Sequence, residues 1–319
     1  MTAQSVLSGL IVMDKPRGPT SHDVVAWARR TLGTRAVGHA GTLDPMATGV
    51  LLILVGSCTK LSQFLTLDEK SYLATVRLGT GTDTLDAEGR VVEQHPVPRR
   101  IVEALEAHGQ GEGPVAPAPW EAALRREQER AMQVPPDHSA IKQQGQAAYV
   151  RARKGQHVHL PPRPVRVTGL AVVGATADPP DLTLSVTVSK GYYVRALARD
   201  LGEGLSVPAH LTSLRRTSSG PFTLAGAVTM QATAETVREA LRPLEQVARA
   251  AMPGAQLTWD GALRTLQGKR LTGADFVEPM GWEGPTAWFA PNGRLVAVGH
   301  LNDSTPVVQR AFLHTSQLC

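Results

Sequence analysis

One carboxylate stands out in the stretch Gly38–Gly49, which reads GHAGTLDPMATG, because mostly small residues surround it. Glycines there allow the backbone to approach a ligand closely, and Pro45 biases Asp44 towards an extended or turn conformation. The apolar run Val50–Val55 follows and is typical of a buried strand. A loop carboxylate on a rigid strand is a common catalytic arrangement, although an Asp-Pro pair alone is more often a turn.

The sequence contains no motif for a metal or a nucleotide cofactor. It lacks a Walker loop, a strand-linked GxGxxG, CxxC, HExxH and GxSxG. A carboxylate with a basic partner is then the minimal device for covalent or acid–base chemistry, and a nearby arginine would keep that carboxylate ionised. A tyrosine could stack on a base and carry a proton. Base-directed chemistry on folded RNA, with the base flipped out, is one use of such residues.

The basic side chains are unevenly distributed along the chain. The whole chain has 33 Lys and Arg against 28 Asp and Glu, but residues 251–319 carry five of each. Residues 138–177 contain no carboxylate, and their Lys and Arg residues are Lys142, Arg151, Arg153, Lys154, Arg163 and Arg166. This pattern indicates a polyanion-binding surface, with a merely solvated basic face as the alternative.

The length of 319 residues predicts one large and one small unit. Apolar runs and alternation predict strands at residues 10–13, 50–55, 72–78, 165–173 and 182–188. Helical spacing predicts helices at residues 21–32, 59–67, 101–107, 120–132, 196–205, 208–216 and 233–251. From about Met252 the composition changes to short strands with glycine turns, which indicates a small all-β appendage.

Cys58 and Cys319 are the only cysteines, so neither a disulfide framework nor a cysteine metal site is expected. The first residues lack the basic start of a signal peptide, and no apolar run approaches the ~20 residues of a membrane span. These features favour a cytoplasmic protein that is not bound to a membrane.

Five segments resemble, in order, the motifs of the tRNA pseudouridine synthase B (TruB) family, bacterial stand-alone type. They read GLIVMDKPRGPTSHD, GHAGTLDPMATGVLLI, KSYLATVRLGTGTDTLDAEG, PPDHSAIKQQGQAAYVRAR and SKGYYVRALARDLGE. The resemblance implies an α+β pseudouridine synthase fold, with a mixed, mainly antiparallel sheet, flanking helices and the active cleft across its middle. It places a catalytic domain at residues 1–250, an RNA-binding thumb at about 108–160, and a β-rich PUA-like RNA-binding domain at 251–319.

The activity implied by the resemblance is isomerisation of uridine to pseudouridine at position 55, in the T-loop of tRNA. The enzyme would be a monomer that uses no cofactor and no metal, and its partner would be the T-arm of tRNA, with the acceptor stem as a further contact. Two alternatives stay open: a tRNA-folding chaperone whose chemistry is dispensable, and another base-directed enzyme such as a glycosylase.

The resemblance also assigns residues. Asp44 matches the nucleophilic aspartate, Tyr72 the tyrosine that stacks on the target uracil, and Arg195 the arginine that pairs with the aspartate. The residues expected to bind RNA are Lys15, on a loop near the active site, His39, which takes up space in the rearranged T-loop, and Lys142, Arg151, Arg153, Lys154, Lys190 and Tyr193. His138 departs from the family, which usually has a tyrosine there.

Overall fold

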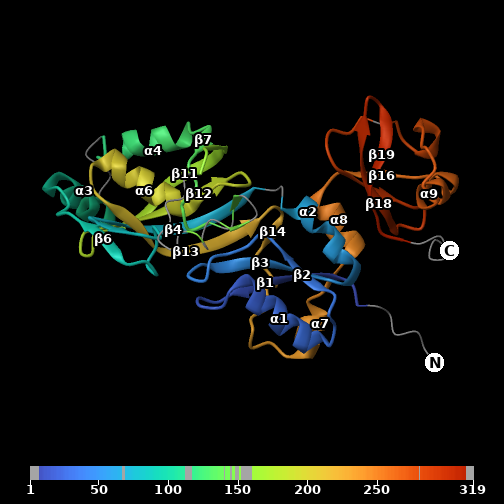
Figure 1. The fold of residues 1–319 in the computed structure, drawn as a ribbon, viewed down its shortest axis with the longest axis horizontal. Coiled ribbons are helices and arrows are strands. Elements are labelled where there is room, and N and C mark those ends of the chain that lie inside the picture. The colour runs from blue at the N-terminus through green and yellow to red at the C-terminus, as the bar shows by residue number, and fades with distance from the viewer. Residues whose placement is uncertain are drawn as a thin grey trace.

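The computed structural model describes residues 7–66, 69–111, 117–139, 141–143, 146–147, 151, 160–279 and 281–313, and two larger sheets organise them (Figure 1). The main sheet has the order β11-β12-β4-β13-β3-β1-β15, with β14 beside β13 and β2 beside β3. Its strands are β1 (Gly9–Lys15), β2 (Val37–Ala40), β3 (Thr48–Val55), β4 (Lys70–Leu78), β11 (Val167–Thr176), β12 (Asp181–Val188), β13 (Ala209–Ser219), β14 (Phe222–Thr223) and β15 (Arg242–Pro243). Only β13 and β3 pair in parallel, so the expected mixed, mainly antiparallel sheet is confirmed.

Helices cover the main sheet because their apolar faces join its core. The helices are α1 (Ser21–Leu32), α2 (Ser62–Leu65), α3 (Arg99–Gly109), α4 (Glu121–Gln128), α6 (Val194–Leu205), α7 (Ala234–Glu239) and α8 (Leu244–Ala251), with a 3₁₀ turn η1 (Gly56–Leu61). Short strand pairs are β5 (Thr80–Thr82) with β6 (Val91–Gln94), β7 (Met132–Gln133) with β10 (Arg163–Pro164), and β8 (Lys142–Gln143) with β9 (Gln146–Ala147). Figure 1 shows α4 and α6 together over the half of the sheet that contains β11, β12 and β4.

Helix α1 illustrates how local sequence sets an element's ends. Thr20 and Asp23 form a capping box, in which each side chain accepts from the other residue's backbone N–H. Gly33 ends the helix in the left-handed conformation that glycine adopts without strain. The helix therefore ends where the sequence predicted, and its buried face packs into the main core.

The prediction of a helix at residues 208–216 is wrong, because this segment belongs to β13, between β4 and β3. Leu211 lies opposite Val76 and Leu214 lies opposite Ala74, so both leucines share one face of the sheet. The intervening β-bulge inserts one extra residue and changes their spacing from two to three. That spacing imitates the period of a helix, which explains the error.

Other expected elements differ in extent. The helix predicted for residues 120–132 ends at Gln128, and Met132 begins β7. The single helix predicted for residues 233–251 is two helices, α7 and α8, separated by the short strand Arg242–Pro243. Proline has no N–H for the helical ladder, so its place at the start of α8 fits a helix boundary.

A second sheet follows α8, with the order β16-β17-β18-β19 (Figure 1). Its strands are β16 (Gly254–Gln256), β17 (Thr286–Phe289), β18 (Leu295–Asn302) and β19 (Thr305–Ala311). The helix α9 (Trp259–Leu266) and a 3₁₀ turn η2 (Gly273–Asp275) lie between β16 and β17, so the expectation of an all-β unit missed a helix. The domain boundary near residue 250 and the PUA-like character of this unit stay predictions.

The two sheets share apolar packing. Phe289 and Phe312 belong to the same buried cluster as Leu52 and Leu54 of β3. Between the sheets, the guanidinium of Arg249 lies 3.7 Å from the ring centre of Phe289, a cation–π contact. The C-terminal sheet is therefore joined, with α2 and α8 between the two sheets, to the core on the face of the main sheet that is opposite α1 (Figure 1).

At Gly49 the parallel strands β3 and β13 approach each other closely, because Gly49 lies opposite Arg216. Its φ is +96°, and an added Cβ would meet the backbone carbonyl oxygen and nitrogen of Arg216. We predict that Gly49→Ala lowers the free energy of unfolding by about 3 kcal/mol or more, because strain and a backbone clash add together. Urea denaturation would measure the change.

Gly226→Ala is the matched control for this substitution. Gly226 also has a positive φ, +69°, but nothing lies within 4 Å of its would-be Cβ. It should cost only the conformational strain, about 1 kcal/mol. Equal losses for the two variants would contradict the claim that close approach of β3 and β13 demands glycine.

Candidate active site

The loop that carries Asp44 joins β2 to β3. A buried arginine holds the first part of this loop through hydrogen bonds to its backbone carbonyls. Arg216, on β13, is 1% exposed. Its Nε donates to the carbonyl of Val50 (2.6 Å), and its two Nη atoms donate to Gly41 (2.9 Å) and Thr42 (3.4 Å). These bonds turn loop carbonyls inwards and tie the loop to the parallel strand pair.

A buried lysine holds the second part of the same loop. Lys15 is fully buried, and its Nζ donates to the carbonyls of Pro16 (3.0 Å), Pro45 (3.1 Å) and Ala47 (2.7 Å). Burial lowers the pKa of Lys15 to about 8, while the charge of Asp44 acts in the opposite direction. Lys15 was expected on a loop facing RNA. That position is wrong: the residue ends β1, and its buried ammonium supports the Asp44 loop instead.

Helix α1 supplies a third support. The Ser21 hydroxyl donates to the carbonyl of Leu43 (3.1 Å) and accepts from its N–H (2.9 Å), so the residue before Asp44 is fixed on both sides. Among the residues that the structure describes, no backbone group forms a hydrogen bond with the side chain of Asp44, which is 39% exposed. The loop is rigid where it faces the core and presents its carboxylate outwards.

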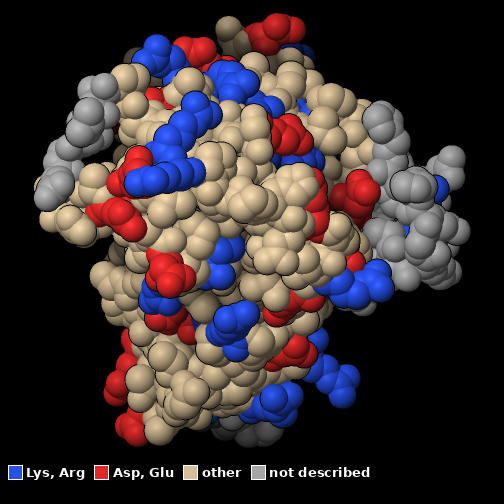
Figure 2. Space-filling model, turned by 90° about the vertical axis from the view of Figure 1, so that its left-hand side faces the viewer, with Lys and Arg blue, Asp and Glu red and all other residues tan. Residues whose placement is uncertain are grey.

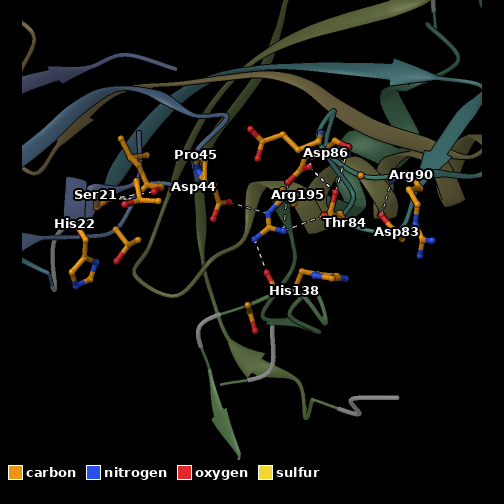
Figure 3. A pocket seen from close by; sticks show the side chains of 16 residues that line it. Ser21, His22, Asp44, Pro45, Asp83, Thr84, Asp86, Arg90, His138 and Arg195 are labelled. Carbon is orange, nitrogen blue, oxygen red and sulfur yellow. Dashed lines mark hydrogen bonds and ion pairs between the residues drawn. The ribbon is translucent and has the colours of Figure 1, made fainter. Parts of the chain in front are cut away.

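Arg195, on the first turn of α6, faces that carboxylate (Figure 3). Its Nε lies 2.9 Å from Asp44 Oδ2, an ion pair in which the arginine side chain is only 7% exposed. Nη1 donates to the carbonyl of Thr84 (3.1 Å) and Nη2 to that of His138 (2.9 Å). The arginine is therefore held on three sides, and the structure brings together the pair that the motifs suggested.

Asp86 is a site residue that the sequence reasoning missed. Its Oδ2 lies 3.6 Å from Nη1 of Arg195, and its side chain is 6% exposed. Its Oδ1 accepts from the Thr84 hydroxyl (2.6 Å) and from the Glu88 N–H (3.0 Å). Arg195 thus lies between the buried carboxylate of Asp86 and the exposed carboxylate of Asp44. The available signal was the loop TDTLDAEG, whose acidic turns directly follow the strand of Tyr72.

Two hollows meet at Asp44. One, of about 770 Å³, includes His22, Asp83, Asp86, Arg90 and His138 in its walls (Figure 3). The other, of about 260 Å³, is walled by three tyrosines, Tyr72, Tyr192 and Tyr193, together with Val194 and Leu214. Both are lined by Thr42, Leu43, Asp44, Ser139 and Arg195.

The smaller hollow has the chemical character of a pocket for a planar ring. Tyr72 lies on the buried face of β4 and is 9% exposed, so it contributes to the core and to the pocket wall. Burial raises the pKa of Tyr193, while the neighbouring Ser139 acts against that rise. Aromatic walls beside one carboxylate suit a nucleobase, which stacks on such rings.

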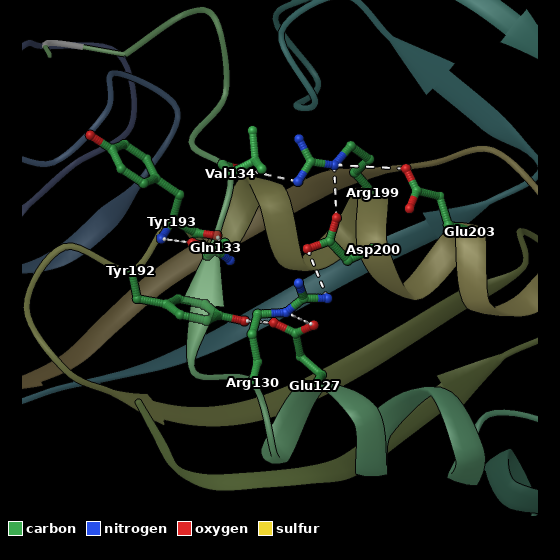
Figure 4. Close-up of polar contacts among 9 residues, drawn as sticks. All are labelled: Glu127, Arg130, Gln133, Val134, Tyr192, Tyr193, Arg199, Asp200 and Glu203. Carbon is green, nitrogen blue, oxygen red and sulfur yellow. Dashed lines mark hydrogen bonds and ion pairs between the residues drawn. The ribbon is translucent and has the colours of Figure 1, made fainter. Parts of the chain in front are cut away.

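The start of α6 is anchored by a buried polar network (Figure 4). The Tyr192 hydroxyl donates to Glu127 (2.6 Å), whose other carboxylate oxygen accepts from Arg130 (2.6 Å). Arg130 also pairs with Asp200 of α6 (3.1 Å). Burial raises the pKa of Glu127, and the bonds from Tyr192 and Arg130 oppose that shift. The network ties the end of α4 to Tyr192, which precedes Arg195, and to Asp200, which follows it in α6.

Gln133 holds both backbone groups of Tyr193, the residue that precedes α6. Its side-chain amide accepts from the N–H of Tyr193 (2.8 Å) and donates to the carbonyl of the same residue (3.2 Å). Arg199, further along α6, donates to the carbonyl of Val134 (3.2 Å). Residues 127–138 therefore form a cradle for α6, and through His138 they reach Arg195 itself.

The other residues expected to bind RNA lie in different surroundings. His39, on β2, is partly buried and contacts His22 edge to face, with ring centres 5.4 Å apart. Burial lowers the pKa of His39. Lys190 is exposed on the turn before α6, and Arg151 is partly buried. Arg153, Lys154 and the side chain of Lys142 lie outside the described residues.

The face that carries α3 and α4 is not a basic surface. Figure 2 shows Lys and Arg interspersed there with Asp and Glu. Two exposed ion pairs, Arg90 with Asp83 and Arg99 with Glu103, are examples. Such charges compensate one another, so this face offers little attraction for a polyanion.

Within the described ranges, no helix combines the length and apolar character that a membrane span requires. In the same part of the chain, no group of three or more His, Cys, Asp or Glu side chains is arranged to hold a metal ion. Cys58 is buried and unpaired, and burial raises its pKa to about 12. The expected absence of cofactor and metal stays a prediction.

Known proteins are similar to this chain in sequence and in fold. The TruB family pseudouridylate synthase (N terminal domain) profile matches residues 29–194, and the tRNA pseudouridylate synthase B C-terminal domain profile matches residues 195–249. The chain is 43% identical to the tRNA pseudouridine synthase B of Thermobifida fusca (strain YX), covering 94% of this chain and 97% of that protein. It is 45% identical to that of Arthrobacter sp. (strain FB24), covering 92% of each.

A solved structure, that of a Cbf5-Nop10-Gar1 complex, contains a chain of similar fold. It aligns with a TM-score of 0.70 and 24% identity, covering 98% of this chain and 87% of that one, which supports the fold alone. The two profiles and the relatives above 40% identity decide the family. The chain belongs to the TruB family of pseudouridylate synthases.

Proposed function

We propose that this protein isomerises uridine to pseudouridine at position 55, in the T-loop of tRNA, without a cofactor. The observation that carries the proposal is the exposed Asp44 carboxylate, paired with a buried arginine at the mouth of an aromatic pocket. Relatives over 40% identical along nearly the whole chain are named tRNA pseudouridine synthase B, which supports the same activity here.

The reaction needs a nucleophile, a stacking surface and no external reagent. Asp44 attacks the target nucleoside covalently, and the N1–C1′ bond breaks. C5 then bonds to C1′, the bond to Asp44 breaks and restores the free carboxylate, the C5 proton leaves, and N1 takes up a proton. The product is an isomer of the substrate, so nothing is oxidised or reduced. Arg195 pairs with the carboxylate and orients it, and Tyr72 stacks on the uracil and is the candidate for the proton step.

The target uridine must be flipped out of its base stack to reach the pocket. A pocket that encloses one planar base beside Asp44 cannot take a base that is still stacked within a helix. His39, Lys190, Tyr193 and the basic stretch of residues 138–177 are the proposed RNA contacts, with Lys142, Arg151, Arg153 and Lys154 in that stretch. We propose the T-arm as the principal contact and a monomer as the active form. Because the substrate is tRNA, we place the reaction in the cytoplasm.

Tritium release from RNA tests the proposed reaction. A tRNA transcript labelled with tritium at C5 of its uridines should release one equivalent to water, because bond formation at C5 expels the label. The same transcript with cytidine at position 55 should release none. Tight tRNA binding without release would instead favour the folding chaperone, and free uracil among the products would favour a glycosylase.

The ion pair gives a second prediction. Arg195→Lys keeps the positive charge but cannot bond Asp44 and the carbonyls of Thr84 and His138 together. A hydrogen bond that involves a charged group contributes about 1.5–3 kcal/mol, so we expect single-turnover tritium release to slow by about 10- to 100-fold. The control is tRNA affinity by filter binding, which should change only a few-fold. A rate within a few-fold of wild type would contradict the role given to Arg195.

A further inference from the structure

Ser139 carries a buried hydroxyl that forms no hydrogen bond with the part of the protein that the structure describes. The residue is 2% exposed. It lines both hollows, together with Asp44 and Arg195. A hydroxyl removed from water without a partner costs free energy, and in folded proteins such groups are rarely left so. Because Ser139 also lines both hollows, a ligand that enters them can supply the missing partner.

The position of Ser139 does not depend on its own hydroxyl. The preceding carbonyl, that of His138, is held by Arg195 at 2.9 Å, so the same guanidinium fixes Asp44 and the segment leading into Ser139. A weak interaction of the Ser139 hydroxyl with the Tyr193 phenol opposes the rise in the pKa of that phenol, but within the described residues the Ser139 hydroxyl has no partner at full hydrogen-bonding geometry. The Ser139 hydroxyl is thus prepositioned and available.

We propose that the Ser139 hydroxyl donates a hydrogen bond to a carbonyl oxygen of the target uracil when the base enters the smaller hollow. This inference rests on the proposed function. The aromatic and aliphatic walls of that hollow suit the faces of a base, so its polar edge must meet one of the few polar groups present. A hydroxyl donor beside the Asp44–Arg195 pair supplies that contact without adding charge.

The first experiment compares Ser139→Ala with a matched control, Ser219→Ala. Ser219 is also buried, 1% exposed, and its hydroxyl also lacks a partner, but it ends β13 and lines neither hollow. Both variants remove a hydroxyl that the free protein does not satisfy. We therefore expect each melting temperature to stay the same or rise.

Activity should separate the two variants. Ser139→Ala should slow single-turnover tritium release roughly three- to ten-fold, the value of one lost neutral hydrogen bond, while Ser219→Ala should match wild type. Ser139→Thr, which keeps the hydroxyl, should recover most of the rate. Wild-type activity in Ser139→Ala would overturn the proposal, and so would a fall in melting temperature together with equal slowing in both serine variants.

The second experiment identifies the partner atom. T-arm RNAs with 2-thiouridine or 4-thiouridine at position 55 replace one uracil carbonyl oxygen at a time with sulfur, a weaker acceptor. For one of the two, the effects of sulfur and of Ser139→Ala should not add. Additive effects for both RNAs would overturn the contact with uracil. An inactive wild-type protein on unmodified tRNA would instead refute the proposed function itself, so the two failures are distinguishable.

Discussion

Two buried cations beneath the loop of Asp44 are the constraint on which the site depends. Lys15 and Arg216 together donate to six backbone carbonyls, most of them in or beside the loop of residues 41–47. A buried charge without partners would cost several kcal/mol, so these bonds commit the loop to one conformation. Because its carbonyls point inwards to the cations, the loop can present the Asp44 carboxylate outwards. Position in the fold, rather than the Asp-Pro pair itself, supports the proposal that this aspartate is the nucleophile.

The other half of the site comes from segments distant in sequence. Arg195 lies between Asp44 and Asp86, and one carboxylate oxygen of Asp86 is held by hydrogen bonds within its own turn. The cradle of residues 127–138 then fixes α6 through Glu127 and Gln133. This cradle leads into the basic stretch proposed to hold RNA. The segment that leads into the proposed RNA-binding stretch therefore also sets the position of Arg195.

Much of this was predictable from local patterns, and the exceptions have physical causes. The strands around Tyr72 and after Asp44 follow apolar periodicity, as does helix α1. The helix expected in place of β13 failed because a β-bulge changes the spacing of Leu211 and Leu214, which only the partner strand reveals. Lys15 and Asp86 were misjudged or missed for another reason. A charged residue is read as exposed by default, and its burial depends on partners that the tertiary structure brings from elsewhere.

The most direct test of Asp44 as the nucleophile is single-turnover tritium release by Asp44→Asn beside wild type, with tRNA affinity measured on the same preparations. The amide keeps the size of the side chain but removes the charge that pairs with Arg195 and the nucleophile itself. We expect the asparagine variant to release no detectable tritium and to bind tRNA with an affinity within a few-fold of wild type. Turnover by the asparagine variant at an appreciable fraction of the wild-type rate would contradict the claim that the Asp44 carboxylate performs the reaction.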